Sequence, residues 1–309
     1  MVDNQSRMKK LYLQIFGSLA VIALGAVLFY FSKDLQFERI LNSLGSFPKG
    51  TVLLVLLCSS AQIVFMVLRF WTLLPSEVPL SKASRCLVFG HLANNFAPAR
   101  AGEALKIILL SKGSNPIPLL TATGSFAADR IADLLTLIFI FFAFGAYRSP
   151  VFQFSLPALD IRIALILGAV FLALGVLLFT NSKIKNHIKS GLEKLTFGFR
   201  NLANPKKFAL SFLFGVSCWY AEVVALYLLC SAQGLTVSAG EIIGIIVILN
   251  LGLSLAFSVA NVGTFEASMV FALSRLHCPT ETAIAIAVCH HAIQLVAVVI
   301  LSSFLALRK

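Results

Sequence analysis

Three charged side chains stand together in the middle of an otherwise apolar stretch. Asp129, Arg130 and Asp133 lie about 10 to 14 residues into the run 119–146. A charge at the centre of a membrane helix costs about 2.5–3.5 kcal/mol, so these groups should face away from lipid. They predict a cation that acids hold in a water-filled cavity, where it could receive an anionic headgroup. Alternatively, Arg130 and Asp133 share a helix face and could form an internal ion pair that fixes the bundle.

A second polar group opens a short helix. Arg100, Gly102 and Glu103 follow the break Ala97-Pro98-Ala99, and Lys106 lies one turn further on. A helix N-terminus inside the membrane offers unpaired N–H groups and a partial positive charge, which suit a phosphate or a carboxylate. These residues are therefore candidates for headgroup binding. Glu103 could instead cap the helix, exchange a proton, or pair with a cationic headgroup.

Three more residues could relay protons. His290 and His291 lie in the last apolar run and Glu222 lies in an earlier one. Histidine titrates nearest physiological pH, which suits this role. Each histidine could equally be a hydrogen-bonded core side chain. Arg69, five residues before the end of its run, is expected to extend to the membrane interface.

No arrangement typical of a catalyst stands out. The sequence has no serine-centred elbow, no Walker loop and no HExxH. The six cysteines lie in or beside apolar segments and lack the spacing of metal ligands. We therefore expect that the protein is not an enzyme and uses neither a metal nor a cofactor.

The composition explains why buried charges matter in this chain. Of its 309 residues 59% are hydrophobic and 12% charged, and the mean hydropathy is +0.92. A soluble domain has about 25% charged residues. These values exclude an ordinary soluble globule and predict an all-α, polytopic membrane bundle. The net charge of +12 then favours cytoplasmic loops near anionic lipids, and no nucleic-acid partner is expected.

Apolar runs divide the chain into two kinds of segment. Residues 84–112 and 241–275 predict pairs of short helices, broken at 97–99 and 261–263. Broken backbone is tolerated inside a membrane only where protein or water satisfies it. The remaining long runs are expected to be full spans of the membrane, at about 11–31, 51–74, 119–146, 162–180, 208–231 and 281–307.

Basic residues indicate how the broken segments run. The loop 181–207 carries seven Lys or Arg residues against one acid and should be cytoplasmic, as should the basic N- and C-termini. If both broken segments are re-entrant, six spans remain and all three basic regions lie inside. If each segment crossed once, the loop and the C-terminus would lie outside. We therefore predict two re-entrant hairpins.

The broken segments resemble each other at an offset of 163 residues. Glu103 corresponds to Glu266, which joins the candidates for headgroup binding, and Pro116 corresponds to Pro279. We expect one transmembrane domain, residues 1–309, with repeat one at about 51–146 and repeat two at about 208–307. Three spans separate the hairpins, so the repeats would be inverted, as in many alternating-access transporters.

These motifs resemble the flippase-like membrane family named after the transmembrane region of lysylphosphatidylglycerol synthase. The resemblance rests on the segments 94–103 (NNFAPARAGE), 129–133 (DRIAD) and 263–267 (GTFEA), and it covers about residues 10–305. It implies a protein of a bacterial or archaeal cytoplasmic membrane that moves lipids between leaflets. The chain lacks the aminoacyl-transferase domain of the bifunctional synthases, so lipid lysylation is not expected.

The resemblance and the buried charges together predict a lipid translocase. Its substrate would be an anionic, aminoacylated, or isoprenoid- or glycan-linked lipid, so the partners would be a phospholipid or a polyprenyl-linked lipid. One alternative is a proton-coupled transporter of a small polar solute. Another is a non-transporting membrane partner of a lipid-modifying enzyme.

Overall fold

The computed structural model describes residues 36–95, 101–152, 196, 199–254 and 261–307. Within these residues the chain is helical and has no strand, which confirms the expected all-α class. The expected spans 11–31 and 162–180, the break at 97–99 and most of the loop 181–207 lie outside the described residues.

Three of the described helices are long and apolar enough to cross a membrane. They are α3 (Lys49–Leu73), α9 (Pro205–Ala232) and α12 (Thr280–Leu307), with 25, 28 and 28 residues. At 1.5 Å per residue, each exceeds the roughly 30 Å of a bilayer's hydrocarbon core. They agree with the runs expected at 51–74, 208–231 and 281–307, and the protein is a multi-pass membrane protein.

The helix α6 (Leu119–Ala143) has the same length as α3 but a different composition. It carries the three charges at 129, 130 and 133, and eight of its other residues are buried. It ends before Gly145, whose φ of 65° lies in the left-handed region. The expected run 119–146 is therefore helical to Ala143, and two short 3₁₀ turns follow, η2 (Ala146–Arg148) and η3 (Pro150–Phe152).

Both broken segments contain pairs of short helices. The first pair is α4 (Leu80–Asn94) and α5 (Ala101–Ser111); the second is α10 (Ala239–Ser254) and α11 (Thr264–Ser274). Asn261 and Gly263 have φ values of 57° and 84°, which an α-helix does not accommodate. The interruption expected at 261–263 is therefore confirmed.

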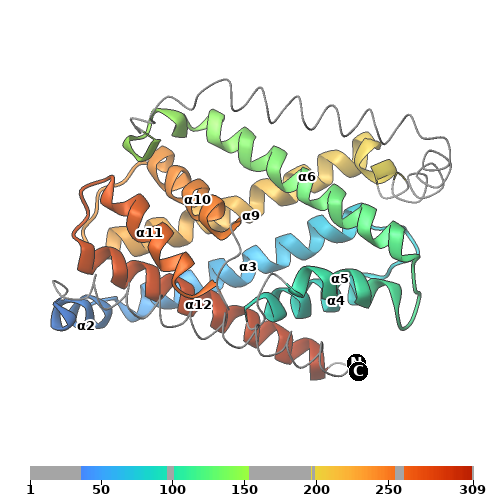
Figure 1. The fold of residues 1–309 in the computed structure, drawn as a ribbon, viewed down its shortest axis with the longest axis horizontal. Coiled ribbons are helices and arrows are strands. Elements are labelled where there is room, and N and C mark those ends of the chain that lie inside the picture. The colour runs from blue at the N-terminus through green and yellow to red at the C-terminus, as the bar shows by residue number, and fades with distance from the viewer. Residues whose placement is uncertain (1–35, 96–100, 153–195, 197–198, 255–260, 308–309) are drawn as a thin grey trace, which may run out of the picture.

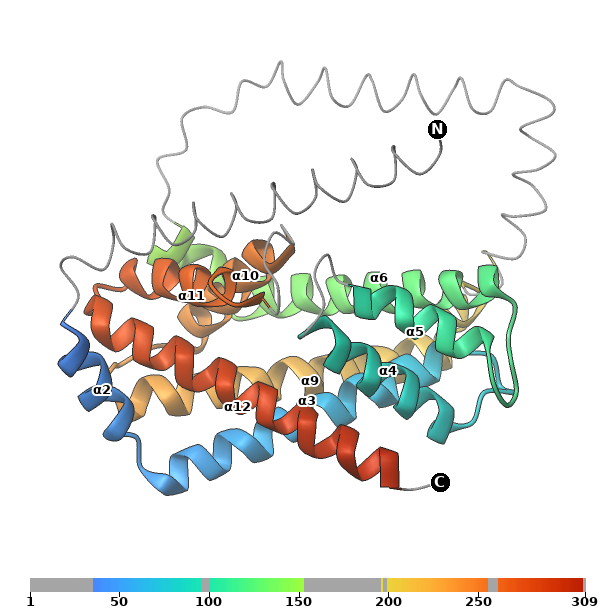
Figure 2. The ribbon, with the colours of Figure 1, turned by 60° about the horizontal axis from the view of Figure 1, so that its bottom comes forward.

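The two pairs occupy opposite ends of the bundle. In Figures 1 and 2, α4 and α5 lie at one end, where α3 and α12 finish and α6 and α9 begin. The pair α10 and α11 lies at the other end, beside α2 (Phe37–Gly45). Long helices connect the ends, and α3 packs along α9.

Side-chain amides tie the chain together at both ends. Near α4 and α5, the amide of Asn201 donates to the carbonyl oxygens of Leu73 and Leu74, at 3.0 and 2.9 Å. At the other end, the amide of Gln233 donates to the carbonyl oxygen of Ser43, at 3.0 Å. Asn201, four residues before α9 begins, and Gln233, directly after it ends, therefore lie at opposite ends of the bundle.

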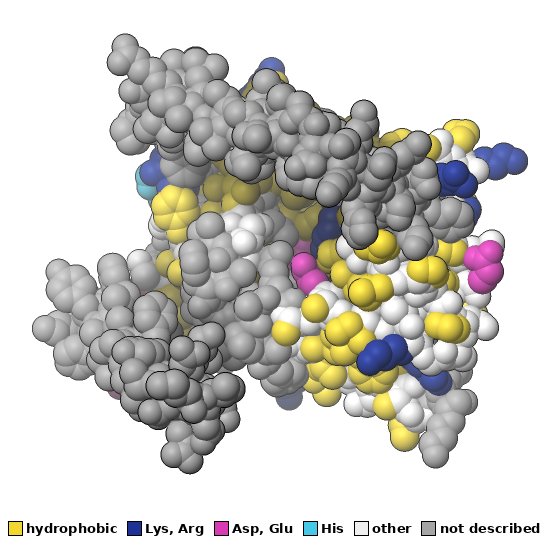
Figure 3. Space-filling model, turned by 45° about the vertical axis from the view of Figure 1, so that its right-hand side comes forward, with side chains coloured by type: hydrophobic (Ala, Val, Ile, Leu, Met, Phe, Trp, Pro, Cys, Tyr) yellow, Lys and Arg dark blue, Asp and Glu magenta, His cyan; other side chains and the backbone are white. Residues whose placement is uncertain are grey.

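Apolar side chains cover the outside of the bundle as well as its core. Leu53, Leu57, Leu134 and Phe142 are more than half exposed, as expected of helices that face lipid. Figure 3 shows a face whose described surface is mostly hydrophobic or neutral, with acidic and basic side chains in a recess near its centre.

The hairpin of α4 and α5 depends on two close approaches. A methyl group on Gly102 would lie 1.9 Å from the carbonyl oxygen of Gly90, so the helices cross almost backbone to backbone. The buried ammonium of Lys82 donates to four carbonyl oxygens that lie after or near the end of α5, those of Leu110, Lys112, Ser114 and Asn115, at 2.8 to 3.1 Å. Together these contacts hold α5 antiparallel to α4.

We predict that Gly102→Ala lowers the free energy of unfolding by about 1–3 kcal/mol, because the added methyl group forces α4 and α5 apart. Gly50→Ala in α3 is the matched control, since no atom lies within 4 Å of its added methyl group. The control should leave stability unchanged or raise it by up to about 1 kcal/mol. Unfolding of both variants in detergent micelles checks this, and equal stability would contradict the crossing.

Candidate functional site

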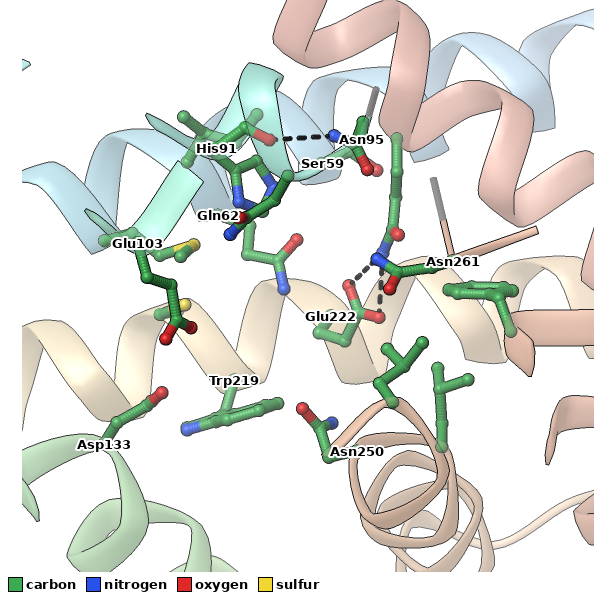
Figure 4. Close-up of a pocket in the computed structure, with 18 of the residues that line it drawn as sticks. Ser59, Gln62, His91, Asn95, Glu103, Asp133, Trp219, Glu222, Asn250 and Asn261 are labelled. Carbon is green, nitrogen blue, oxygen red and sulfur yellow. Dashed lines mark hydrogen bonds between the residues drawn. The ribbon is translucent and has the colours of Figure 1, made fainter. Parts of the chain in front are cut away.

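A polar cavity lies between the hairpins and the long helices. Its volume is about 190 Å³. Figure 4 shows Glu103 and Asp133 on one side, Glu222 and Asn250 on the other, and Trp219 between them. Amide side chains make up much of the remaining wall, namely those of Gln62, Asn94, Asn95, Asn261 and Gln294. We call the side of Glu103 and Asp133 the charged side, and the side of Glu222, Asn250, Asn261 and Gln294 the amide side.

Arg69 organises the charged side. Its side chain is 0% exposed, its Nε lies 2.9 Å from Asp129 Oδ1, and its Nη1 donates to Asp133 Oδ1. The expectation that Arg69 extends to the membrane interface is therefore wrong. The helix α3, which carries Arg69, packs beside α6. Asp129 and Asp133 on α6 compensate the charge of the guanidinium, so Arg69 does not need to reach the membrane interface.

Arg130 is the more accessible of the two arginines. Its Nη2 lies 2.8 Å from Asp129 Oδ2, and its Nη1 lies 3.8 Å from Asp133 Oδ2. The side chain is 36% exposed and lies over the ring of Phe126, 5.3 Å from the centroid. Asp129 therefore bridges both arginines, and the expected pairing of Arg130 with Asp133 is the longer contact.

Several buried donors on the cavity wall have no hydrogen-bond partner among the described residues. They include Arg69 Nη2, Arg130 Nε and Trp219 Nε1. Ser59 Oγ is also unpartnered, and all four residues line the cavity. A buried donor without a partner costs about 1–3 kcal/mol. The wall therefore suits an occupant rich in acceptor atoms, or water.

The first hairpin contributes two of its four expected residues to the cavity. Glu103 and Lys106 line it, and Lys106 is 3% exposed. Gly102 is not among the residues that line it and packs against Gly90, and headgroup binding by Gly102 stays a prediction. Arg100 lies outside the described residues.

Glu266 in the second hairpin caps the start of its own helix, α11. Its Oε2 accepts a 2.7 Å hydrogen bond from the backbone N–H of Gly263, and its Oε1 lies 2.7 Å from His291 Nδ1. Phe265 stacks on the His291 ring, with centroids 4.4 Å apart. Glu266 is not among the residues that line the cavity, so the expected equivalence with Glu103 holds for helix position and not for exposure to the cavity.

Glu222 forms a separate cluster on the amide side. The amide nitrogen of Gln294 donates to both of its carboxylate oxygens, at 3.1 and 3.2 Å. His290 Nε2 lies 3.4 Å from Glu222 Oε1. His290 and His291 therefore serve different acids, on α9 and α11, and the three proposed relay residues do not form one cluster.

A comparison with known families identifies the family of this chain. The family described as the lysylphosphatidylglycerol synthase TM region matches residues 15–302. The chain belongs to this family. No protein of curated function matches it. Membership links this membrane protein to lipid handling.

Several residues line the cavity that the sequence did not predict to lie there. Ser59, Gln62 and Arg69 line one face of α3. Their spacings of three and seven residues recur on one side of a helix, so the stripe of polar residues in an apolar span was a usable signal. Trp219 also lines the wall and lies one turn before Glu222, but no spacing rule distinguishes it from an ordinary core tryptophan.

We predict that the two arginines differ in their effect on stability. Arg69→Met should lower the free energy of unfolding by about 3–5 kcal/mol, because it leaves Asp129 buried beside a weaker set of partners. Arg130→Met should cost less, because Arg130 is 36% exposed and Asp129 keeps Arg69. Denaturant unfolding in micelles measures both, and an equal loss would show that Asp129 does not depend chiefly on Arg69.

Proposed function

We propose that the protein is a lipid translocase and that the cavity receives the lipid headgroup while the acyl tails stay in the bilayer. One observation carries the proposal: Arg69, Lys106, Arg130 and Trp219, whose side chains carry hydrogen-bond donors, line one polar cavity between helices of membrane-spanning length. Family membership supports a role in lipid handling. The chain would move its substrate without altering it, so a separate enzyme would make or consume the lipid.

An anionic headgroup fits the charged side of this cavity. Lys106 and Arg130 both line it, and Arg69 Nη2 and Trp219 Nε1 offer further donors. Hydrogen bonds between ionised groups are about twice as strong as neutral ones. The acids Asp129 and Asp133 hold the guanidiniums in place, so a phosphate would meet donors that are already oriented.

Two inverted repeats would explain how such a cavity forms at the centre of the bundle. The helices α5 and α11 end at Ser111 and Ser274, 163 positions apart. Each pair of short helices enters from its own end of the bundle (Figure 2). Broken helices that approach from opposite sides are the usual way in which transporters build a site near the midplane.

Polar residues follow the same plan in both halves. Asp129, Arg130 and Asp133 follow Pro118 by 11, 12 and 15 residues, and His290, His291 and Gln294 follow Pro279 by the same intervals. This offset of 161 residues is two shorter than the 163 that aligns Pro116 with Pro279. The first set contacts Arg69 on α3, and the second contacts Glu222 on α9. In each half, the helix after the hairpin is thus joined by polar contacts to the helix before it.

The distribution of charge supports an orientation. Among the described residues, the end that holds α4 and α5 carries one acid, Glu77, and six basic residues, Lys82, Arg85, Lys112, Arg200, Lys206 and Lys207. The described part of the opposite end has four basic residues, Arg39, Lys49, Arg148 and Arg275, and three acids, Glu38, Glu241 and Glu281. Cytoplasmic ends carry the excess of Lys and Arg. We therefore place α4, α5 and the C-terminal end of α12 on the cytoplasmic side of an inner membrane.

We predict that Arg130→Ala slows the exchange of a lipid between leaflets by roughly tenfold to a hundredfold, because it removes a charged donor to the headgroup. Glu103→Ala should also slow exchange, since Glu103 lines the same wall. The measurement uses the full-length protein in vesicles that contain fluorescent phosphatidylglycerol, with a membrane-impermeant quencher that reports the outer leaflet.

Arg148→Ala is the matched control, because this exposed arginine lies in η2, where it contacts the ring of Tyr147. It should exchange lipid at the wild-type rate. Equal rates for the Arg130 and Arg148 variants would exclude the cavity as the headgroup path. Uptake of a small polar solute without lipid exchange would favour a solute transporter.

Single cysteines on a cysteine-free background test the re-entrant arrangement. We predict that Ser76→Cys, before α4, and Ser114→Cys, after α5, react with an impermeant thiol reagent from the cytoplasmic side. Ser238→Cys, before α10, and His277→Cys, after α11, should react from the opposite side. All four positions are exposed. Labelling of Ser76→Cys and Ser114→Cys from different sides would mean that this segment crosses the membrane.

A further inference from the structure

Glu222 is a carboxylate in an unusual setting. It lies in the apolar helix α9, is 4% exposed, and faces the cavity. Its hydrogen bonds come from the amide of Gln294, and its nearest basic group is His290, at 3.4 Å. A neutral amide compensates a buried negative charge far less well than a guanidinium does.

The acids across the cavity show the contrast. Asp129 and Asp133 both contact the guanidinium of Arg69, and Asp129 also contacts Arg130. The basic partners of these acids are arginines, which keep their charge at any physiological pH. The nearest basic partner of Glu222 is instead an imidazole, a group whose charge depends on a proton.

The surroundings of Glu222 on other helices add little charge. The titratable groups nearest it are Cys58 on α3, Cys218 on its own helix and His290 on α12. The helices α10 and α11 present Asn250 and Phe265 to the cavity, neither of which is charged. The groups on the charged side of the cavity are Arg69, His91, Glu103, Lys106, Arg130 and Asp133.

We propose that Glu222 and His290 form a proton-binding site in the cavity wall and that this proton is the coupling ion of transport. The coupling role rests on the proposed function, whereas proton binding does not. One proton from cavity water binds the Glu222–His290 pair, which removes the uncompensated negative charge. The same proton leaves to water when the cavity opens to the other side, so no oxidant or second reactant is needed.

The site also has an internal reporter. The chain has two tryptophans, and Trp219 lies one helical turn before Glu222 on the same cavity wall. In a Trp71→Phe variant of the full-length protein in nanodiscs, all tryptophan emission comes from Trp219. We expect its emission to follow one protonation step in a pH titration, because the charge on Glu222 changes the field at the indole.

Glu222→Gln should abolish this step, while Glu103→Gln and Glu241→Gln should retain it. Glu103 is the matched control inside the cavity, and Glu241 is one outside it, at the start of α10. A step that survives Glu222→Gln, or that disappears in Glu103→Gln, would overturn the assignment. If Glu222→Gln does not fold, His290→Asn and Gln294→Leu, which alter the contacts of the carboxylate, should each shift the midpoint; an unchanged midpoint in both would also overturn it.

Vesicles with an imposed pH gradient test coupling separately. Wild-type protein should drive fluorescent phosphatidylglycerol toward one leaflet, and Glu222→Gln should exchange it without responding to the gradient. Wild-type exchange that ignores the gradient would overturn the coupling role. A vesicle assay without any exchange, together with a normal Trp219 titration, would instead refute the lipid translocase and leave the proton site standing.

Discussion

The structure depends on one constraint: charge inside a membrane helix must find a partner on a neighbouring helix. Arg69 on α3 meets Asp129 and Asp133 on α6, and each of the three would be costly if it faced lipid. The contact joins α3 and α6, whose outer faces are apolar. Lipid offers these three charged side chains no competing partner. It also leaves Arg130 partly free at the cavity, because Asp129 is shared between the arginines.

The same constraint explains why the broken helices are placed where they are. A helix that stops inside a membrane exposes backbone groups that lipid cannot satisfy, so its ends must face protein or water. The crossing of α4 and α5 at Gly90 and Gly102 lets backbone approach backbone. At the outer end of the same hairpin, the ammonium of Lys82 covers four carbonyl oxygens. In the second hairpin, the carboxylate of Glu266 covers the start of α11, at the interruption itself. The break between α10 and α11 thus finds a partner within its own hairpin.

Local patterns in the sequence predicted the elements better than the contacts between them. Apolar runs gave α3, α9 and α12 within a few residues, and Asn261-Val262-Gly263 marked a true interruption, because both signals depend on nearby residues. Arg69 was misjudged because its distance from the end of its span suggested the interface, while its partners lie 60 and 64 positions away. Gly102 was predicted to bind a ligand because a glycine near a helix start has that role in many proteins. Only the crossing with Gly90 reveals that it also serves packing.

The two sides of the cavity differ in what they can do. The side built by Arg69, Asp129 and Arg130 keeps its charges, because each group has an oppositely charged neighbour, and so it can offer a constant set of donors. On the other side, His290 and Gln294 follow Pro279 at the intervals at which Asp129 and Asp133 follow Pro118. Their partner is Glu222 on α9, as Arg69 on α3 is the partner of the two acids. The charge of an imidazole depends on a proton, and an amide has no charge. A transporter needs both properties, since a constant site recognises the substrate and a variable one makes occupancy depend on an ion gradient. If the proposed repeats are the origin of this arrangement, one duplicated plan has diverged into a permanent ion pair in one half and a protonatable pair in the other.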